Sequence, residues 1–314
     1  MQEYARPTRP PIRRGPFFEI ALLVIVIVGG LLVGNLLGLG VASLVIRSDF
    51  DSILKILAGT AEHPKMQLVL LIVQAAAALT GFVLAPLLYL FLVEQRTLND
   101  LSPNRHFWMV PALLTVVLVI AFMPFNALLI EWNRNINLPD FLDRWENWAK
   151  DKESFAEELT KRLTEFSSVP QLLAGLIVIA LIPAVGEELV FRGLIQPKVH
   201  KLFGNIHTAV WITGFLFSFI HMQFYGLIPR MLLGVLFGYL YAWSGNLWYP
   251  ILGHFINNGF TLVMFYLHQR KSVTIDIEDT ASVPWGTSLA FMVVSGFLLY
   301  RLKMYFDKNR VLTA

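Results

Sequence analysis

Apolar runs of about 20 residues recur along nearly the whole chain, and they constrain its fold more than any other feature. Only a helix or a closed barrel satisfies its own backbone groups in lipid, and a helix of about 20 residues spans the hydrocarbon core. The composition, 56% hydrophobic and 15% charged over 314 residues, is far from that of a soluble domain. We therefore predict an all-α, polytopic membrane protein, a bundle of about eight transmembrane helices with a buried polar active site. The expected spans are 17–46, 66–93, 107–130, 171–195, 207–224, 228–243, 248–267 and 285–305.

The chain divides into five segments on this basis. They are a basic arm (1–16), N-terminal transmembrane helices (17–130), an extramembrane amphipathic segment (131–169), a core that carries polar motifs (170–267), and a last transmembrane helix with a basic tail (268–314). The arm carries four arginines, and the C-terminal tail is also basic. Because an even number of spans puts both termini on one side, the positive-inside rule predicts that both termini are cytoplasmic in a bacterial-type plasma membrane.

The amphipathic segment alternates acidic and basic residues around apolar positions with roughly helical spacing. These positions are Trp145, Trp148, Phe155, Leu159, Leu163 and Phe166. Such a helix lies on the membrane surface or caps the bundle. We favour a packing role for it, and substrate capture or a lid is the alternative.

The absence of cysteine excludes disulfides, a thiolate metal site and a cysteine nucleophile. The formal net charge of +3 is small, so we expect the lipid bilayer, and not a nucleic acid, as a partner. In the first span, Gly30, Gly34 and Gly38 form small-xxx-small repeats that let another helix approach closely, within one chain or between two.

Three charges interrupt the apolar run near residue 190, namely Glu187, Glu188 and Arg192. Each costs about 2.5 to 3.5 kcal/mol at the centre of a membrane helix, so the cluster is a candidate functional site. Glu188 and Arg192 are four residues apart and are predicted to pair, whereas Glu187 points about 100° away and is free to accept a proton from water. The alternative is an ion-pair cluster at the headgroups, because Gln196, Pro197 and Lys198 indicate that the helix ends there.

Two later apolar segments carry histidines. His221 follows an apolar run that ends in Phe-Ser-Phe-Ile, and alone it is more typical of a hydrogen bond between helices than of catalysis. His254 and Asn258 share one face of a helix, where both are able to donate to the same oxygen, as an oxyanion site requires. Asn257 lies about 100° off that face, so we expect it to contact a neighbouring helix.

One conflict remains within these predicted spans. At 1.5 Å per residue, Glu187 and His221 differ in depth by roughly 16 Å in a core of about 30 Å. The two side chains meet only if a predicted helix limit is wrong or the helices tilt strongly.

The order E-E-x-x-x-R, F-x-x-x-H, H-x-x-x-N resembles that of the CPBP family of intramembrane proteases, which includes the CAAX proteases and bacteriocin-processing proteins. The resemblance covers about a third of the chain, roughly 170–267, and includes the stretch Ser-Gly-Asn-Leu-Trp-Tyr-Pro at 244–250. It implies a CPBP-like catalytic core, and the type II CAAX prenyl endopeptidases of this family are also described as eight-helix bundles.

Carried over by motif, the resemblance implies catalytic roles for six residues. Glu187 and His221 would activate a water molecule, and His254 and Asn258 would stabilise the tetrahedral oxyanion. Glu188 and Arg192 would support them. Loss of one oxyanion donor typically costs 100-fold to 1000-fold in rate.

Metal dependence stays open between two descriptions of the family. Glu187, His221 and His254 would form a His2Glu set of Zn²⁺ ligands, the arrangement behind the usual metalloprotease label. The other description is a metal-free glutamate hydrolase.

These features predict an intramembrane endopeptidase that hydrolyses a peptide bond in a membrane-associated protein or peptide, with CAAX-type processing as the analogy. The alternative is a non-proteolytic membrane scaffold, or a protein of the bacteriocin-immunity type, that uses the same fold to bind a peptide.

Overall fold

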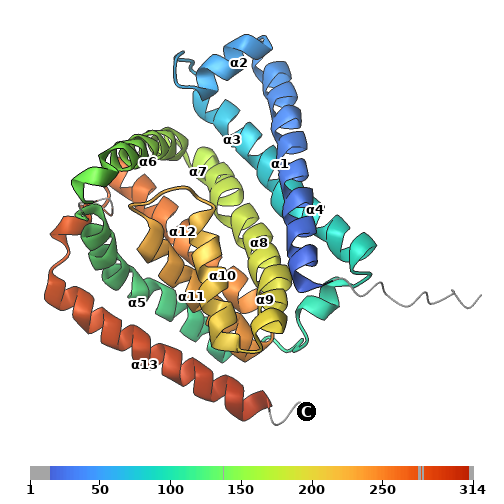
Figure 1. Ribbon diagram of the computed structural model, residues 1–314. Helices are drawn as coiled ribbons and strands as arrows, with labels where there is room; N and C mark the ends of the chain where they lie inside the picture. The colour runs from blue at the N-terminus through green and yellow to red at the C-terminus, as the bar shows by residue number, and fades with distance from the viewer. Residues whose placement is uncertain (1–14, 137, 275–276, 278, 311–314) are drawn as a thin grey trace, which may run out of the picture.

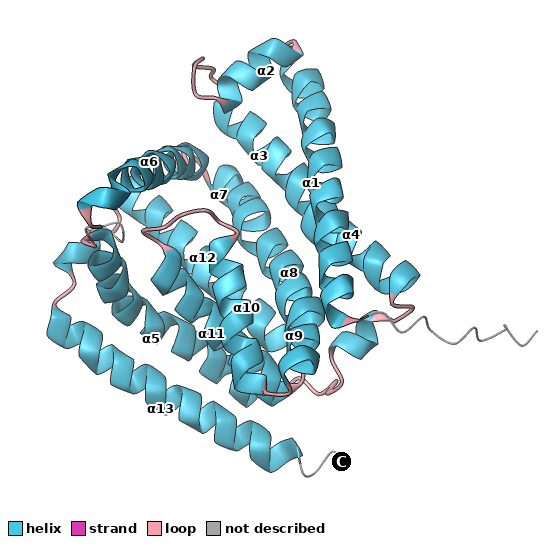
Figure 2. Cartoon of the chain, in the orientation of Figure 1, coloured by secondary structure: helices cyan, strands magenta, loops and turns pink. Residues whose placement is uncertain are grey.

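The computed structural model describes residues 15–136, 138–274, 277 and 279–310, and every regular element in this part of the chain is helical (Figures 1 and 2). The basic arm predicted for residues 1–16 lies outside the described residues except for its last two. The α-helices are α1 (Pro16–Ile46), α2 (Phe50–Leu57), α3 (Met66–Ala78), α4 (Ala85–Leu88), α5 (Met109–Arg134), α6 (Asp143–Thr164), α7 (Val169–Gly175), α8 (Ile182–Glu188), α9 (Gln196–Phe203), α10 (Ile206–Phe219), α11 (Leu227–Ser244), α12 (Trp248–Gln269) and α13 (Trp285–Arg310). Short 3₁₀ turns occupy Leu98–Leu101, Asp140–Leu142 and Thr280–Ser282, and π-helical turns occupy Leu79–Leu84, Tyr89–Val93, Leu176–Leu181 and Leu189–Ile195.

Six helices of the described chain are long and apolar enough to cross a membrane, which makes this a polytopic membrane protein. They are Pro16–Ile46, Met66–Val93, Met109–Arg134, Val169–Phe203, Leu227–Ser244 and Trp285–Asn309. The prediction of about eight is therefore met only in part. Helix α10 is apolar but has 14 residues, and α12 has 22 residues but carries two asparagines and two histidines, which lower its hydropathy.

The fourth long helix runs without a break from Val169 to Phe203, so the prediction that it ends near residue 195 is wrong. Pro183 and Pro197 do not break it, because each lies two residues after a π-helical turn. A π-helical turn shifts the local hydrogen-bond register, and this accommodates a residue that has no N–H to donate. The helix ends at Gly204, which caps it with φ 68°.

This longer helix removes the conflict in depth between the two motifs. Gly204 lies in the turn between α9 and α10. Glu187 lies 17 residues before Gly204, and His221 lies 17 residues after it. At 1.5 Å per residue, both side chains lie at a similar depth, about 25 Å from that turn. Helix α10 also stops at Phe219, five residues earlier than predicted, so His221 lies in the turn beyond its C-terminal end.

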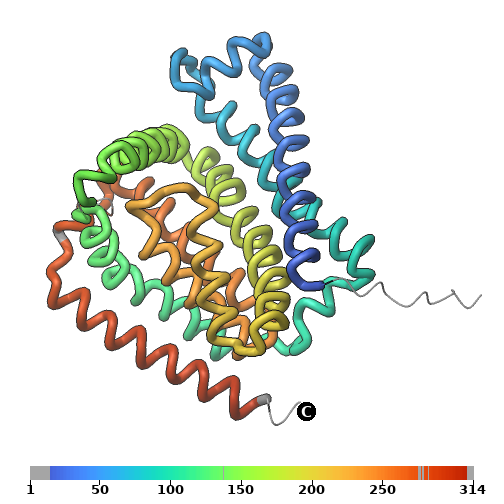
Figure 3. Tube along the Cα trace, viewed as in Figure 1, coloured from blue at the N-terminus to red at the C-terminus, as the bar shows by residue number. Residues whose placement is uncertain are grey.

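The helices run between two ends of one bundle (Figure 3). In the view of Figure 1, the start of α1 and the end of α13 lie at the lower end, and α6 crosses the upper end above α10 and α12. Helix α6 is anchored there by its C-terminal end, because Gln67 Nε2 donates to Leu163 O at 3.0 Å and Gln269 Nε2 donates to Thr164 O at 2.9 Å. The amphipathic segment therefore caps the bundle.

Glycine faces set the closest helix contacts. A Cβ atom on Gly30, Gly34 or Gly38 would lie 2.6 to 2.8 Å from atoms of Thr80, Ala76 or Val73, so this face of α1 packs within the chain. Gly186 is also a contact position, because its Cβ would lie 2.8 Å from Phe82 Cβ. The absence of a side chain at Gly186 thus lets a neighbouring helix approach just before Glu187.

Gly34 and Gly40 provide a matched test of this packing. We expect Gly34→Ala to destabilise the protein by about 1 to 3 kcal/mol through overpacking against Ala76 and Thr80. Gly40→Ala meets no atom within 4 Å and should be neutral or stabilising by up to about 1 kcal/mol, because alanine is the better helix former. Reversible unfolding of both variants in detergent measures this, and equal stabilities would contradict the packing.

Candidate active site

The carboxylate of Glu188 lies at the centre of the polar site and contacts two other polar side chains. Glu188 and Arg192 are both 0% exposed, and Arg192 Nη1 donates to Glu188 Oε1 at 2.8 Å. The predicted pairing across four residues is thus present, although the segment between them is π-helical. The pair lies in the interior of the helix bundle.

Arg192 is held from several directions. Its Nη2 donates to Gly234 O of α11 at 2.7 Å, and its Cζ lies 4.7 Å from the ring centroid of Phe217 and 5.7 Å from that of Phe237. A buried guanidinium needs such partners, because its charge is costly to desolvate. Arg192 therefore joins its own helix to α10 and α11.

His254 of α12 contacts the same carboxylate. Its Nδ1 lies 2.8 Å from Glu188 Oε1, and its ring stacks on Phe237 with 5.5 Å between centroids and 15° between planes. An ionised carboxylate only accepts hydrogen bonds, so Nδ1 carries the proton. In the neutral ring, Nε2 is then left with its lone pair free. No sequence spacing predicts this contact, which joins residues 66 positions apart.

His221 is fixed in the same tautomer by a different partner. Its Nδ1 lies 2.9 Å from the backbone oxygen of Phe217, which only accepts, so Nδ1 is again the protonated nitrogen. The Phe217 ring lies 5.5 Å from the His221 ring, 5.8 Å from the His254 ring and on Arg192. The Phe217 ring thus packs on both imidazoles and on Arg192, and the Phe217 backbone oxygen orients His221.

The two asparagines of α12 both take part in the site. Asn258 Nδ2 donates to Ile179 O at 3.2 Å, and Asn257 Nδ2 donates to Asn258 Oδ1 at 3.1 Å. One N–H of Asn258 is therefore used against the backbone, and the amide has a second. The expectation that Asn257 contacts a neighbouring helix is wrong, because it lines the cavity and bonds within its own helix.

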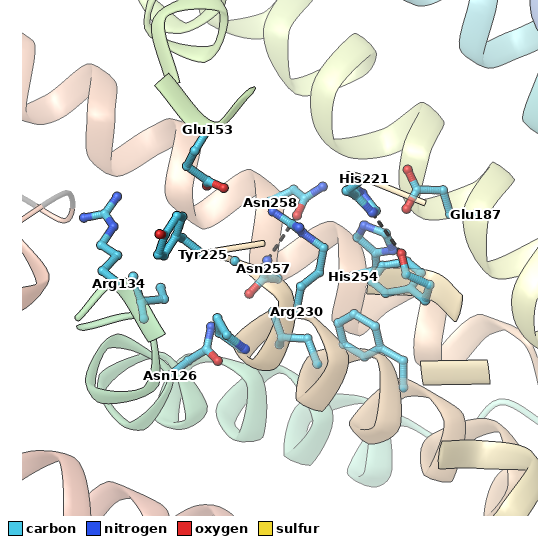
Figure 4. A pocket seen from close by; sticks show the side chains of 16 residues that line it. Asn126, Arg134, Glu153, Glu187, His221, Tyr225, Arg230, His254, Asn257 and Asn258 are labelled. Atoms are coloured by element: carbon cyan, nitrogen blue, oxygen red, sulfur yellow. Dashed lines mark hydrogen bonds between the residues drawn. The ribbon is translucent and has the colours of Figure 1, made fainter. Parts of the chain in front are cut away.

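All three motifs meet in one cavity of about 310 Å³. Glu187, His221, His254 and Asn258 line it, whereas Glu188 and Arg192 lie behind its wall. Figure 4 shows Glu187 and His221 at one end of this cavity and Arg134 and Glu153 at the other. A second cavity of about 650 Å³ shares Ile130, Arg134 and Glu153 with it, so the site adjoins a larger space beneath α6.

Helix α6 contributes Glu153 to the cavity. Burial raises the pKa of Glu153, and Arg230 opposes this rise. Its Oε1 accepts from Gln223 Nε2 at 3.5 Å, and one turn further along α6 Glu157 pairs with Arg134 at 3.0 Å. The helix that caps the bundle is thus also one wall of the cavity mouth.

The described residues contain no group of three His, Cys, Asp or Glu side chains close enough together to hold a metal ion. Glu187, His221 and His254 line one cavity, and zinc binding by this His2Glu set stays a prediction. The Nε2 atoms of both histidines, left free by the Nδ1 contacts, are the ligand atoms that zinc would take.

Sequence reasoning missed several residues of the site. Arg230 was detectable as a lone charge in the apolar segment Leu227–Ser244, where an ionisable residue is unusual. Phe217 and Phe237 act through ring contacts with His254 and Arg192, and among so many phenylalanines only the fold distinguishes them.

The fold and the cavity define a polytopic membrane protein with a carboxylate and histidine site enclosed among its helices. Residues 169–260, which contain all three motifs, match the family model "Type II CAAX prenyl endopeptidase Rce1-like". This segment of the chain is similar to the Rce1-like type II CAAX prenyl endopeptidases, which belong to the CPBP family that the motifs resemble.

Two curated relatives come from Bacillus subtilis (strain 168). "Uncharacterized protein YpbD" is 28% identical over 118 residues, which cover 36% of this chain and 56% of that protein. "Putative membrane peptidase YdiL" is 28% identical over 102 residues, which cover 32% of this chain and 40% of that protein. The chain thus spans about half the length of the relatives that it matches. No solved structure matches the chain.

The buried ion pair is testable by a double-mutant cycle. We expect Arg192→Met to destabilise the protein by about 3 to 5 kcal/mol, because it leaves Glu188 charged and unpaired in the interior. Adding Glu188→Gln should recover part of this loss, since the uncompensated charge is then removed. Unfolding in detergent measures the coupling. Strictly additive losses would show that the two side chains do not interact.

The raised pKa of Glu153 predicts a pH dependence of α6. As pH rises through the usual glutamate range, the unfolded segment loses its proton before the folded one, so the stability of α6 falls. Hydrogen exchange of residues 143–164, corrected for intrinsic rates, should show less protection at about pH 8 than at about pH 5. Glu153→Gln should remove the difference, and the exposed control Asp151→Asn should keep it. Equal pH dependence in both variants would refute the assignment.

Proposed function

We propose that the chain is an intramembrane endopeptidase that hydrolyses a peptide bond in a membrane-associated protein or peptide. The observation that supports this best is the convergence of Glu187, His221, His254 and Asn258 on one cavity inside the bundle. A base, a second proton acceptor and two potential oxyanion donors are the groups that amide hydrolysis needs.

Glu187 and His221 activate the water molecule in this proposal. No hydrogen bond or ion pair within the described residues occupies the Glu187 carboxylate, so it is able to accept the proton of a water. The Nε2 lone pair of His221 is the second acceptor, because Nδ1 is committed to Phe217 O. The two together hold the water as its oxygen attacks the peptide carbonyl carbon.

His254 and Asn258 stabilise the tetrahedral oxyanion. Because its Nδ1–H is committed to Glu188, His254 donates to the oxyanion only when Nε2 is also protonated. Glu188 orients this ring through the Nδ1–H, as a carboxylate does for a catalytic histidine elsewhere. Asn258 donates its second N–H.

The reaction is completed by proton transfer to the leaving amine. The proton that Glu187 takes from water passes to the nitrogen of the scissile bond as the carbon–nitrogen bond breaks. The second proton of the water moves from the new carboxylic acid to the amine, with the Nε2 of His221 as the available acceptor on its way. The products are then a carboxylate and an ammonium group, and Glu187 returns to its ionised form.

The match to the family model supports this class of reaction. CAAX-type processing is the family's activity by its model's description, and one relative is named as a membrane peptidase. We propose by analogy that the substrate is a membrane-associated peptide segment, which reaches the cavity at or near the bilayer surface.

We also propose that α10 and α12 cross the membrane with the six longer helices, which gives eight crossings. This arrangement puts both termini in the cytoplasm, as the basic ends of the chain predict. Helix α6 and the adjoining cavity then lie at the opposite, outer side of the membrane.

Substitution of Glu187 tests the proposal most simply. Glu187→Gln keeps the shape of the side chain but removes its basicity, and it should lower cleavage of a quenched peptide library by about 100-fold to 10,000-fold. The control is Glu62→Gln, an exposed acid outside the cavity. Thermal unfolding of both variants should match the wild type. If no peptide is cleaved and Glu187→Gln still complements a deletion strain, the scaffold alternative replaces the protease.

A further inference from the structure

Arg230 is a second buried arginine beside the site, and no catalytic step uses it. It lies in the first turn of α11 and lines the cavity (Figure 4). In that view its side chain lies between the Glu187 end and the Arg134 end. A cation in the first turn is also unfavourable with respect to the helix dipole, so the helix itself gives no reason for a charge here.

The hydrogen bonds of Arg230 leave most of its donors unused. Its Nη2 donates to Gln223 Oε1 at 2.7 Å, whereas its Nη1 is buried without a partner in the described chain. No ion pair joins it to a carboxylate in the part of the chain that the structure describes. A guanidinium has five N–H donors in a planar fork, so a bidentate acceptor still fits.

The other two arginines close to the cavity differ in this respect. Arg192 pairs with Glu188 at 2.8 Å, and Arg134 pairs with Glu157 at 3.0 Å. Glu153, an acidic residue of the cavity wall, directs Oε1 to Gln223 and leaves Oε2 buried and unbonded. The cavity thus holds a guanidinium whose charge the fold does not neutralise by contact.

The position of the guanidinium is also constrained. A Cβ atom on Gly226 would lie 3.0 Å from Arg230 Nη2 and 3.3 Å from Nη1, so glycine leaves the space that the head group occupies. The side chain is therefore held by its hydrogen bond to Gln223, in a space that a larger residue at position 226 would close. A cation that is fixed but unpaired in a cavity is arranged to bind an anion from outside the chain.

We propose that Arg230 is a specificity-determining subsite that binds a carboxylate of the peptide substrate next to the bond that is cleaved. The inference rests on the proposed hydrolytic function, because a peptide in the cavity brings its anionic group as a carboxylate. That carboxylate is the side chain of an aspartate or glutamate or the C-terminal carboxylate of the peptide. Both offer two oxygens in the geometry that a guanidinium fork accepts.

The test uses pairs of quenched peptides with the purified full chain in detergent. One set replaces Glu by Gln at each position around the cleaved bond, and the other compares a free C-terminal acid with its amide. We expect wild type to cleave the acidic member of one pair with a kcat/KM about 10 to 100 times higher. The set in which this preference appears identifies the source of the carboxylate.

Arg230→Gln should reduce that preference to within about twofold, mainly by loss of activity on the acidic peptide. Arg230→Lys, which keeps the charge but not the fork, should retain an intermediate preference. The control is Arg301→Gln, an exposed arginine of α13 outside the cavity, which should keep the full preference. The subsite is overturned if Arg230→Gln keeps the preference, or if it lowers cleavage of acidic and neutral peptides equally at an unchanged melting temperature.

A binding measurement separates this inference from the proposed function. The Glu187→Gln chain should bind the preferred acidic peptide at least 10 times more tightly than its neutral partner, and adding Arg230→Gln should abolish the difference. If wild type cleaves nothing but this difference is present, hydrolysis is refuted and the subsite stands. If peptides are cleaved and bound without regard to charge, the subsite is refuted and hydrolysis stands.

Discussion

One oxygen of a buried carboxylate, Glu188 Oε1, organises the site. It accepts hydrogen bonds from Arg192 and from His254, at 2.8 Å each, and both partners are almost fully buried. Arg192 in turn donates to the backbone of α11, so a single carboxylate connects three helices. Without Arg192 the carboxylate would be an unpaired charge in the interior, and without Glu188 the imidazole of His254 would have no fixed tautomer.

The charged residues that hold the helices together lie apart from the carboxylate that lines the cavity. Glu188 and Arg192 lie behind the cavity wall, whereas Glu187, the next residue along the chain, lines the cavity. The two neighbouring glutamates therefore have different surroundings because a helix turns by about 100° per residue. Aromatic rings from α10 and α11 cover Arg192 and contact His254, so both partners of Glu188 pack against the same rings.

Local sequence patterns correctly predicted the features that depend on residues close together in the chain. Apolar runs gave the long helices to within a few residues in α1, α11 and α13, and a spacing of four predicted the Glu188 and Arg192 pair. The end of the fourth long helix was mispredicted because Pro197 usually stops a helix, and here a π-helical turn precedes it. The packing of distant helices determines the rest, and the spacing of residues along the sequence does not encode it. This packing brings His254 to Glu188, and it places Asn257 and Arg230 in the cavity wall.

The tautomer of His254 is the most direct test of this account. Solid-state ¹⁵N NMR of histidine-labelled protein, with His254→Asn to assign the ring, distinguishes a protonated Nδ1 from a protonated Nε2. We predict a protonated Nδ1 whose signal shifts when Glu188→Gln weakens its acceptor, while the His221 ring, bonded to the Phe217 backbone, stays unchanged. A neutral His254 ring protonated only at Nε2, or one that is insensitive to Glu188→Gln, would contradict the shared carboxylate.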